Sequence, residues 1–274
     1  MNSSSSIGVF DSGIGGLSVL RQLIRFLPYE SYIYLGDTAR VPYGNKSSET
    51  VNTYAEESAE FLMNKGVKLI VVACNTVSSV AMDTVRRLAG DIPVIGMITP
   101  AAGAALRATN NGKIGVIGTR ATISSGSYEN KILELAGNKN IQVFSQACPL
   151  FVPFVEEGLD RHKAAEMIAE EYLYSLKKEK TDTLVLGCTH YPLLSELLAR
   201  LMPGVSLIDS GEHASVTALR LLADRKLLAE ERADFVLKPE IGFYVTDIPA
   251  VFHELAQRFL GFDIKSPKKV ELGG

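Results

Sequence analysis

The sequence predicts an α/β protein with a doubly wound parallel sheet, and three observations lead to this fold class. Apolar runs of strand length alternate along the chain with amphipathic stretches of helix length. The run Val67–Ala73 is continuous and rich in β-branched residues, which is typical of a strand buried on both faces. The alternating pattern then starts again in the second half of the chain, with Lys113–Gly118 as its first strand.

The first half of the chain alternates strands and helices in a regular order. Apolar side chains within Val51–Lys65 recur at helical spacing, whereas Ile7–Phe10 is a short apolar run that ends at a polar Asp11 and a glycine-rich turn. The expected strands are Ile7–Phe10, Ser31–Leu35, Val67–Ala73 and Ile92–Ile95, and the expected helices are Leu17–Phe26 and Val51–Lys65.

The second half repeats this alternation, and the last quarter extends it. Two segments are expected to connect the halves: a crossover at Pro93–Pro100 and a return at Asp209–Gly211. The expected strands are Lys113–Gly118, Ile141–Ser145, Asp182–Gly187 and Ile241–Val245, and the expected helices are Tyr128–Leu135, Ala164–Leu176, Ser215–Leu222 and Pro249–Leu260.

Two short motifs are echoed between the halves. The sequence IGVF at Ile7–Phe10 matches IGVI at Ile114–Ile117, an offset of 107, and VVAC at 71–74 echoes VLGC at 185–188, an offset of 114. Two similar offsets in the same order favour duplicated halves. Chance similarity is the alternative, because I-G-V is common at strand ends.

Composition excludes several classes of protein. The chain has 274 residues, of which 46% are hydrophobic, so it can bury a large core. Its 28 basic and 31 acidic residues give a net charge of −3, and without a basic excess we expect neither nucleic acid nor membrane as a partner. The N-terminal segment lacks the apolar core of a signal peptide, and no apolar run is long enough to span a bilayer.

The three cysteines, Cys74, Cys148 and Cys188, are few, odd in number and widely spaced. This pattern matches neither a disulfide framework nor a zinc site, so we expect a cytoplasmic protein with no metal.

Four segments place polar or reactive residues where strands are expected to end, and ligands of open α/β sheets collect there. These segments are Asp11–Gly16, Pro42–Asn45, Cys74–Thr76 and Cys188–His190. The first fails the dinucleotide fingerprint because Ser18 stands at the third glycine position. For the first segment a tight capped turn, and for the second a surface turn, is the alternative to a binding site.

Cys74 and Cys188 each follow a buried strand and precede an expected helix. A helix N-terminus favours a thiolate, so this position is expected to lower the pKa of each thiol. One such cysteine is more often inert core than catalytic, but two in matching contexts favour chemistry. Cys148, which precedes Pro149 in a loop-like stretch, is expected to be structural.

Proton transfer is the chemistry that best suits two opposed thiols. Neither cysteine has the local context of a Cys–His hydrolase, and the C-x5-R phosphatase loop is absent. A redox pair would require the two thiols to touch. A thiolate on one face of a substrate and a thiol on the other could instead invert a carbon centre without a cofactor.

Four motifs together resemble the aspartate/glutamate racemase family. They are DSGIGGLS at 11–18, VPYG at 41–44, ACNT at 73–76 and GCTHYP at 187–192, and the match runs from about Ile7 to Gly211 in the same order. The resemblance implies an isomerase that interconverts L- and D-glutamate without pyridoxal and supplies D-glutamate for the peptidoglycan of the cell wall. A racemase of another acidic amino acid such as aspartate, a non-catalytic acidic amino-acid binding protein and a thiol-redox protein are the alternatives.

The resemblance also implies roles for individual residues. Cys74 takes the proton from D-glutamate, and Cys188 takes it from L-glutamate. Asp11 and His190 flank one thiol each, while an assisting glutamate is either Glu156 or Glu157, and Asp37 is a weaker candidate. The implied substrate contacts are Asp11, Ser12, Tyr43, Gly44, Asn75, Thr76, Thr189 and His190.

The architecture implied by the resemblance is two pseudo-symmetric, doubly wound domains with the active site between them. Residues 1–97 and 210–274 form one discontinuous domain, and residues 98–209 form the other. Many members are homodimers, which we expect here as well. Some members carry an N-terminal extension that binds a peptidoglycan precursor as an activator, and we expect no such activation for this chain.

Overall fold

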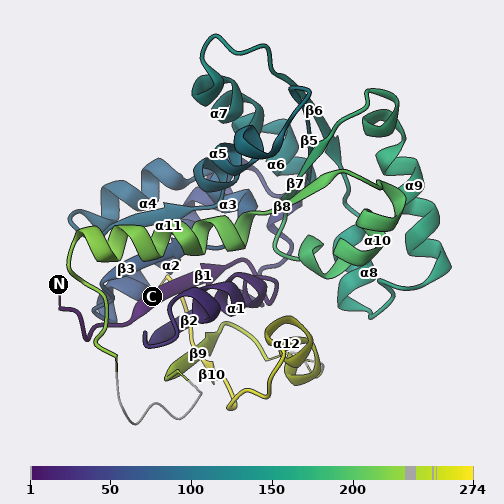
Figure 1. Cartoon of the computed structure of the whole chain (residues 1–274). Helices are drawn as coiled ribbons and strands as arrows, with labels where there is room; N and C mark the ends of the chain where they lie inside the picture. The colour runs from purple at the N-terminus through teal and green to yellow at the C-terminus, as the bar shows by residue number, and fades with distance from the viewer. Residues whose placement is uncertain (1, 232–238, 249, 251, 274) are drawn as a thin grey trace.

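The computed structural model describes residues 2–231, 239–248, 250 and 252–273, and its strands form two parallel sheets (Figure 1). The strands of the first sheet are β1 (Ile7–Asp11), β2 (Tyr32–Gly36), β3 (Leu69–Val72), β4 (Val94–Gly96), β9 (Ile241–Val245) and β10 (Lys268–Lys269). Those of the second sheet are β5 (Lys113–Gly118), β6 (Gln142–Ala147), β7 (Thr183–Gly187) and β8 (Ser206–Asp209). The predicted α/β class is confirmed.

Helices cover both faces of the first sheet. Alternation along β1 explains this, since Val9 packs into one core with Leu20 while Phe10 packs into another with Val51 and Val77. The first core contains α1 (Leu17–Phe26), α11 (Ser210–Asp224) and α12 (Phe252–Leu260). The second contains α2 (Ser48–Asn64), α3 (Asn75–Val80) and α4 (Met82–Ala89).

The second sheet is covered in the same way. Val116 on β5 packs with Ala101 and Tyr128, whereas the adjacent Ile117 belongs to the core that contains Leu173. The first of these faces is covered by α5 (Ile98–Ala108) and α7 (Ser127–Ala136). The other is covered by α8 (Phe151–Glu156), α9 (Lys163–Lys178) and α10 (Ser195–Leu201).

The two sheets share one topology, which makes the fold pseudo-symmetric as predicted. The first sheet has the order β10-β9-β2-β1-β3-β4 and the second β6-β5-β7-β8, so the order 2-1-3-4 is repeated as 6-5-7-8. The echoed sequence motifs fall on the equivalent strands β1 and β5, and at the ends of β3 and β7. This agreement favours duplicated halves over chance similarity.

The chain enters the second sheet once and then returns to the first. The strands of the second sheet lie within residues 113–209, whereas the first sheet takes strands from residues 7–96 and 241–269. The helix α11 begins the return at Ser210, and the Asp209 side chain caps it by accepting a hydrogen bond from the Gly211 N–H at 2.8 Å.

The expected crossover at Pro93–Pro100 differs from the structure, because α5 already begins at Ile98. Pro100 is the third residue of this helix. A proline is tolerated in the first turn, because the backbone N–H groups there have no intrahelical partner. The first turn of the expected helix Pro249–Leu260 cannot be compared, since Pro249 and Val251 lie outside the described residues.

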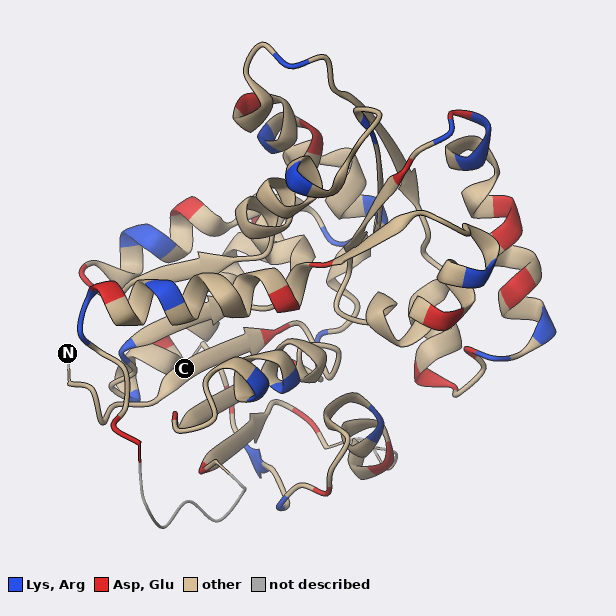
Figure 2. Ribbon diagram, viewed as in Figure 1, with Lys and Arg blue, Asp and Glu red and all other residues tan. Residues whose placement is uncertain are grey.

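Charged side chains of both signs are interspersed over the outer helices (Figure 2). Among the described residues, no helix is both long and apolar enough to cross a membrane.

Candidate active site

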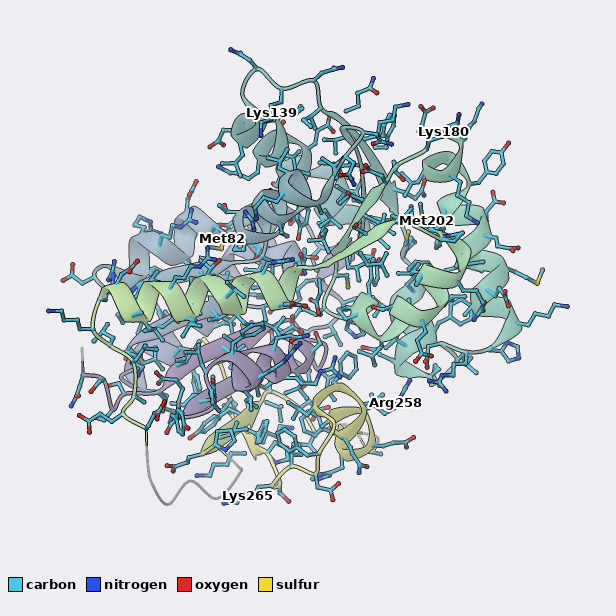
Figure 3. The ribbon with its side chains drawn as sticks, in the orientation of Figure 1. Met82, Lys139, Lys180, Met202, Arg258 and Lys265 are labelled. Carbon is cyan, nitrogen blue, oxygen red and sulfur yellow. The ribbon has the colours of Figure 1, made fainter. Side chains whose placement is uncertain are left out.

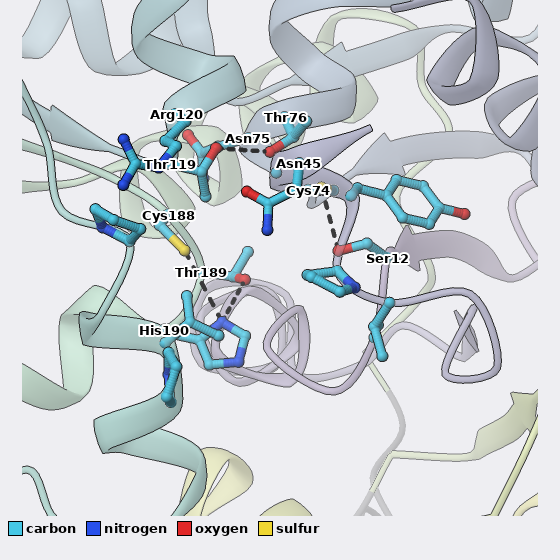
Figure 4. Close-up of a pocket in the computed structure, with 18 of the residues that line it drawn as sticks. Ser12, Asn45, Cys74, Asn75, Thr76, Thr119, Arg120, Cys188, Thr189 and His190 are labelled. Carbon is cyan, nitrogen blue, oxygen red and sulfur yellow. Dashed lines mark hydrogen bonds between the residues drawn. The ribbon is translucent and has the colours of Figure 1, made fainter. Parts of the chain in front are cut away.

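A cavity of about 250 Å³ lies where the carboxyl ends of the two sheets face each other (Figure 4). This is the edge at which parallel sheets hold their ligands. From the first half the cavity is lined by Ser12, Gly13, Val41, Pro42, Tyr43, Gly44, Asn45, Cys74, Asn75 and Thr76. From the second half it is lined by Thr119, Arg120, Pro149, Val152, Pro153, Glu156, Cys188, Thr189 and His190.

The cavity brings together the two predicted catalytic cysteines and all the predicted substrate contacts except Asp11. Asp11 is buried behind the lining, at the end of β1, and its Oδ2 accepts a hydrogen bond from the Gly13 N–H at 3.0 Å. Cys148 also lies outside the lining, in the hydrophobic core, and its thiol faces the Gln146 carbonyl at 3.6 Å. That position agrees with a structural role for Cys148.

The glycine-rich turn between β1 and α1 reaches across to the second half. A Cβ atom on Gly15 would lie 2.4 Å from both the Cε1 of His190 and the Oγ1 of Thr189, so only glycine fits there. The sequence placed these glycines in a turn, and their tight contact with the His190 ring is what the structure adds.

Cys74 is the N-cap residue of α3, directly after β3, and its thiol lies 3.5 Å from the Ser12 hydroxyl. Burial, and after it the nearby Asp11 carboxylate, raise the pKa of this thiol to about 12. The backbone N–H of Val77 acts in the opposite direction but is outweighed. The expectation that the helix N-terminus would lower this pKa is therefore wrong, because desolvation is the larger effect.

Asp11 has an unusual environment for a carboxylate. Burial is the largest effect on its pKa and raises it, while the charge of His190 and backbone N–H groups act to lower it. Its Oδ1 is buried and has no hydrogen-bond partner among the described residues. Asp11 thus acts on the cavity through Cys74 and the Gly13 turn.

Cys188 follows β7, and its sulfur lies 3.9 Å from the Nδ1 of His190. The next helical turn is the 3-10 helix η2 (Tyr191–Leu194), which begins three residues further on, so Cys188 is not at the N-terminus of an α-helix. The predicted match between the two local contexts is wrong at this point. The group next to the Cys188 sulfur is the His190 ring, where the N-terminus of a helix was expected.

His190 links Cys188 to Glu156. Its Nε2 lies 3.0 Å from the Oε1 of Glu156. Burial acts to lower the pKa of His190, but Cys188 and Glu156 outweigh it and raise the pKa to about 10. Of the two adjacent glutamates, Glu156 makes this contact and lines the cavity, whereas Glu157 is exposed and does not line it.

Hydrogen bonds hold the polar lining of the cavity in place. The Tyr128 hydroxyl donates to Asn75 Oδ1 at 2.6 Å, and the Asn75 amide donates to the Ser210 hydroxyl at 3.4 Å, so the orientation of this amide is fixed. The Thr76 hydroxyl meets that of Thr119 at 3.0 Å, which joins the two halves.

Tyr43 is the first residue of the 3-10 helix η1 (Tyr43–Asn45), and its hydroxyl donates to the buried carboxylate of Asp37. Asp37 also accepts hydrogen bonds from Arg40 at 2.6 Å and from Thr246 at 2.8 Å. Asp37 is not among the residues that line the cavity, so it anchors the Tyr43 loop from behind.

Sequence reasoning missed Thr119 and Arg120, although a signal was available. The offset of 107 that relates β1 to β5 carries Ser12 to Thr119 and Gly13 to Arg120. The apolar wall of Pro149, Val152 and Pro153 had no such signal. Within the described ranges, no group of three or more His, Cys, Asp or Glu side chains could hold a metal ion.

The fold and the cavity together define the class of protein. This is an α/β enzyme scaffold of two like halves whose shared cavity holds acid–base side chains and hydrogen-bond donors.

Comparison with known proteins identifies the family. Residues 7–218 match the Asp/Glu/Hydantoin racemase family, and the chain belongs to that family as an amino-acid racemase. It is 47% identical to the glutamate racemase of Chlorobaculum tepidum over 275 residues, covering 100% of this chain and 98% of the relative.

Solved structures agree with this assignment. The glutamate racemase of Francisella tularensis in complex with D-glutamate has a TM-score of 0.90 and 41% identity, and the match covers 98% of each chain. A glutamate racemase isoform of Bacillus anthracis has a TM-score of 0.91 and 40% identity, again over 98% of each chain.

Proposed function

We propose that this racemase interconverts L- and D-glutamate by moving the Cα proton between Cys188 and Cys74, without a pyridoxal cofactor. One observation carries the proposal: the two thiols follow the equivalent strands β3 and β7 and line one cavity from opposite halves. Glutamate is supported as the substrate by the names of similar proteins, which are glutamate racemases.

The step from L-glutamate begins with Cys188 as a thiolate. It removes the Cα proton, the C–H electron pair is delocalised into the α-carboxylate, and the Cys74 thiol delivers its proton to the opposite face. The product is D-glutamate, with Cys188 as a thiol and Cys74 as a thiolate. The reaction from D-glutamate reverses each transfer.

The charges that surround the two sulfurs support this direction of transfer. His190, whose pKa is raised to about 10, carries a positive charge at neutral pH and lies 3.9 Å from the Cys188 sulfur. Cys74, whose pKa is raised to about 12, holds its proton until the transfer. The cavity therefore presents a base on one side and an acid on the other.

The polar lining is suited to the developing negative charge. A Cα proton is very weakly acidic, and the enolate-like carboxylate that forms on its removal needs hydrogen-bond donors. Ser12, Asn75, Thr76 and Thr189 offer such donors around the cavity. Asp11 contributes by holding the turn that carries Ser12 and by raising the pKa of Cys74.

The wider setting follows from the same proposal. Residues 1–97 with 210–274 and residues 98–209 are the two domains that hold the substrate between them, and the enzyme works in the cytoplasm as a homodimer. The D-glutamate that it makes is used for peptidoglycan synthesis.

The test is incubation with L-glutamate in deuterated water, without added pyridoxal cofactor. We expect the optical rotation to fall to zero while deuterium enters at Cα, because a solvent-exchanged thiol delivers the new proton. L-Aspartate serves as the parallel substrate. An absence of exchange with L-glutamate would disprove the proposal, and faster turnover of L-aspartate would reassign the substrate.

A further inference from the structure

We infer that Arg120 captures the anionic substrate at the mouth of the cavity, and that the groove it shares with Lys46 is the entry path. The inference rests on the proposed function, because it assumes an acidic amino acid as the substrate. It assigns Arg120 a role in substrate binding that is separate from proton transfer.

Arg120 is the one arginine or lysine in the lining of the cavity, all of whose residues are described. The other charged groups at the site do not favour a dicarboxylate. Glu156 lines the cavity and Asp11 lies buried close behind it, so both oppose an incoming anion. His190 is engaged with Glu156 and Cys188, which leaves Arg120 as the free positive charge of the lining.

The Arg120 side chain is exposed, and no hydrogen bond or ion pair to another described residue engages its guanidinium. Its backbone is well held, since Arg120 is the first residue of α6 (Arg120–Ser124), whose N-cap Thr119 accepts a hydrogen bond from the Thr122 N–H at 3.2 Å. Figure 4 shows it, like the adjacent Thr119, among the residues that line the cavity. A fixed backbone with a free guanidinium suits the capture of a carboxylate.

A second hollow adjoins the cavity and shares Gly44, Asn45 and Arg120 with it. Lys46 also lines this hollow, together with serines of both halves. The three shared residues place this hollow, called the groove below, directly beside the cavity, and Arg120 borders both. Lys46 is exposed and, like Arg120, has no side-chain partner among the described residues.

Two positively charged side chains thus border the groove. Lys46 lines only the groove, whereas Arg120 lines both the groove and the cavity. An anion that enters along the groove meets Lys46 first and Arg120 second. An exposed charge of this kind raises the local concentration of an anion and is screened by salt.

The test measures kcat and KM for L-glutamate as a function of salt concentration in Arg120→Gln, Arg120→Lys, Lys46→Gln and Lys139→Gln. Lys139→Gln is the matched control, because it removes the same charge at a site away from the cavity. Lys139 is exposed and lies outside both hollows, in the loop after α7 (Figure 3). We expect R120Q to raise KM about three-fold at low salt with kcat unchanged. R120K should keep the wild-type KM, K46Q should raise it less than R120Q, and K139Q should not raise it.

Salt separates capture from a structural role. The difference in KM between R120Q and wild type should shrink as salt is added, which a packing defect would not do. An unchanged KM in R120Q, a fall in kcat instead, or an equal effect of K139Q would overturn the inference. If the wild-type enzyme does not turn over glutamate at all, the proposed function itself fails, which is distinct from turnover with no dependence on Arg120.

Discussion

The surroundings of the two thiols differ far more than the strands that carry them. β3 and β7 hold equivalent positions in their sheets, and each delivers a cysteine to the same cavity. Cys74 lies against a serine hydroxyl with a buried carboxylate nearby, whereas Cys188 lies against a histidine that is paired with Glu156. The backbone is pseudo-symmetric, but the electrostatics are not.

This asymmetry within a duplicated fold matters for the proposed two-base reaction. Two identical environments would give both sulfurs the same protonation state, and transfer between them needs one thiol and one thiolate. The Asp11 carboxylate raises the pKa of Cys74, whereas the charge next to Cys188 is the positive one of His190.

Replacing either thiol should have the largest effect. We expect Cys74→Ser and Cys188→Ser each to lower kcat for inversion about 10³-fold, because a serine hydroxyl is a far weaker acid than a thiol. The measurement is the decay of optical rotation. Cys148→Ser is the matched control and should remain active, since Cys148 lies in the core outside the cavity. An inactive C148S protein that is still folded would contradict the structural assignment of Cys148.

Gly15→Ala should come next, with a loss of about 100-fold in kcat. The added methyl group would collide with the His190 ring and Thr189 and displace the partner of Cys188. Circular dichroism should confirm that the variant folds. Gly103→Ala is the control, because a Cβ there, within α5, meets only the end of the Arg107 side chain at 3.3 Å. Equal activity of the two variants would mean that the Gly15 contact does not position His190.

Glu156→Gln should lower kcat about ten-fold, the cost of weakening a charged hydrogen bond. It should also change the pH profile. We expect wild-type activity to depend on the positive charge of His190 and to fall as pH rises through about 10, where His190 loses its proton. Because the Glu156 carboxylate raises the pKa of His190, its removal should move this alkaline limb to lower pH. Glu157→Gln should leave the profile where it is, and a shift of equal size there would refute the assignment of Glu156.

Asp11→Asn should have the smallest effect, of about three-fold, on the reactivity of Cys74 rather than on the fold. Loss of the carboxylate removes a charge that raises the pKa of Cys74, so a larger fraction of this thiol ionises at a given alkaline pH. The rate of alkylation by iodoacetamide, measured in a background that lacks the other two cysteines, reports the change. Slower alkylation would show that Asp11 acts on Cys74 by another route.

Much of the fold could be predicted because strands buried on both faces have a clear pattern. The runs at β3 and β7 are continuous and apolar, and the echo between the halves indicated the shared topology. The helix α5 escaped prediction because alanines, a glycine and an early proline hide its helical period. The edge strand β8 escaped because it is short and its burial is mixed.

The sequence indicated which residues gather around the cavity, but not the electrostatics of the cavity. Motifs place Cys74 and Cys188 at strand ends, yet the pKa of Cys74 depends on its burial and on Asp11, which is distant in sequence. The choice between Glu156 and Glu157 likewise depends on which side chain α8 directs towards His190. Such properties arise only when the two halves are brought together.

The most direct test of opposed thiols is deuterium exchange at Cα in each single-cysteine variant, followed separately for the two enantiomers. C74S retains Cys188 and should exchange the Cα proton of L-glutamate but not that of D-glutamate, while C188S should do the reverse. Neither should invert its substrate at an appreciable rate. If both variants exchange both enantiomers alike, or if C188S inverts L-glutamate at the wild-type rate, the two thiols do not serve opposite faces of the substrate.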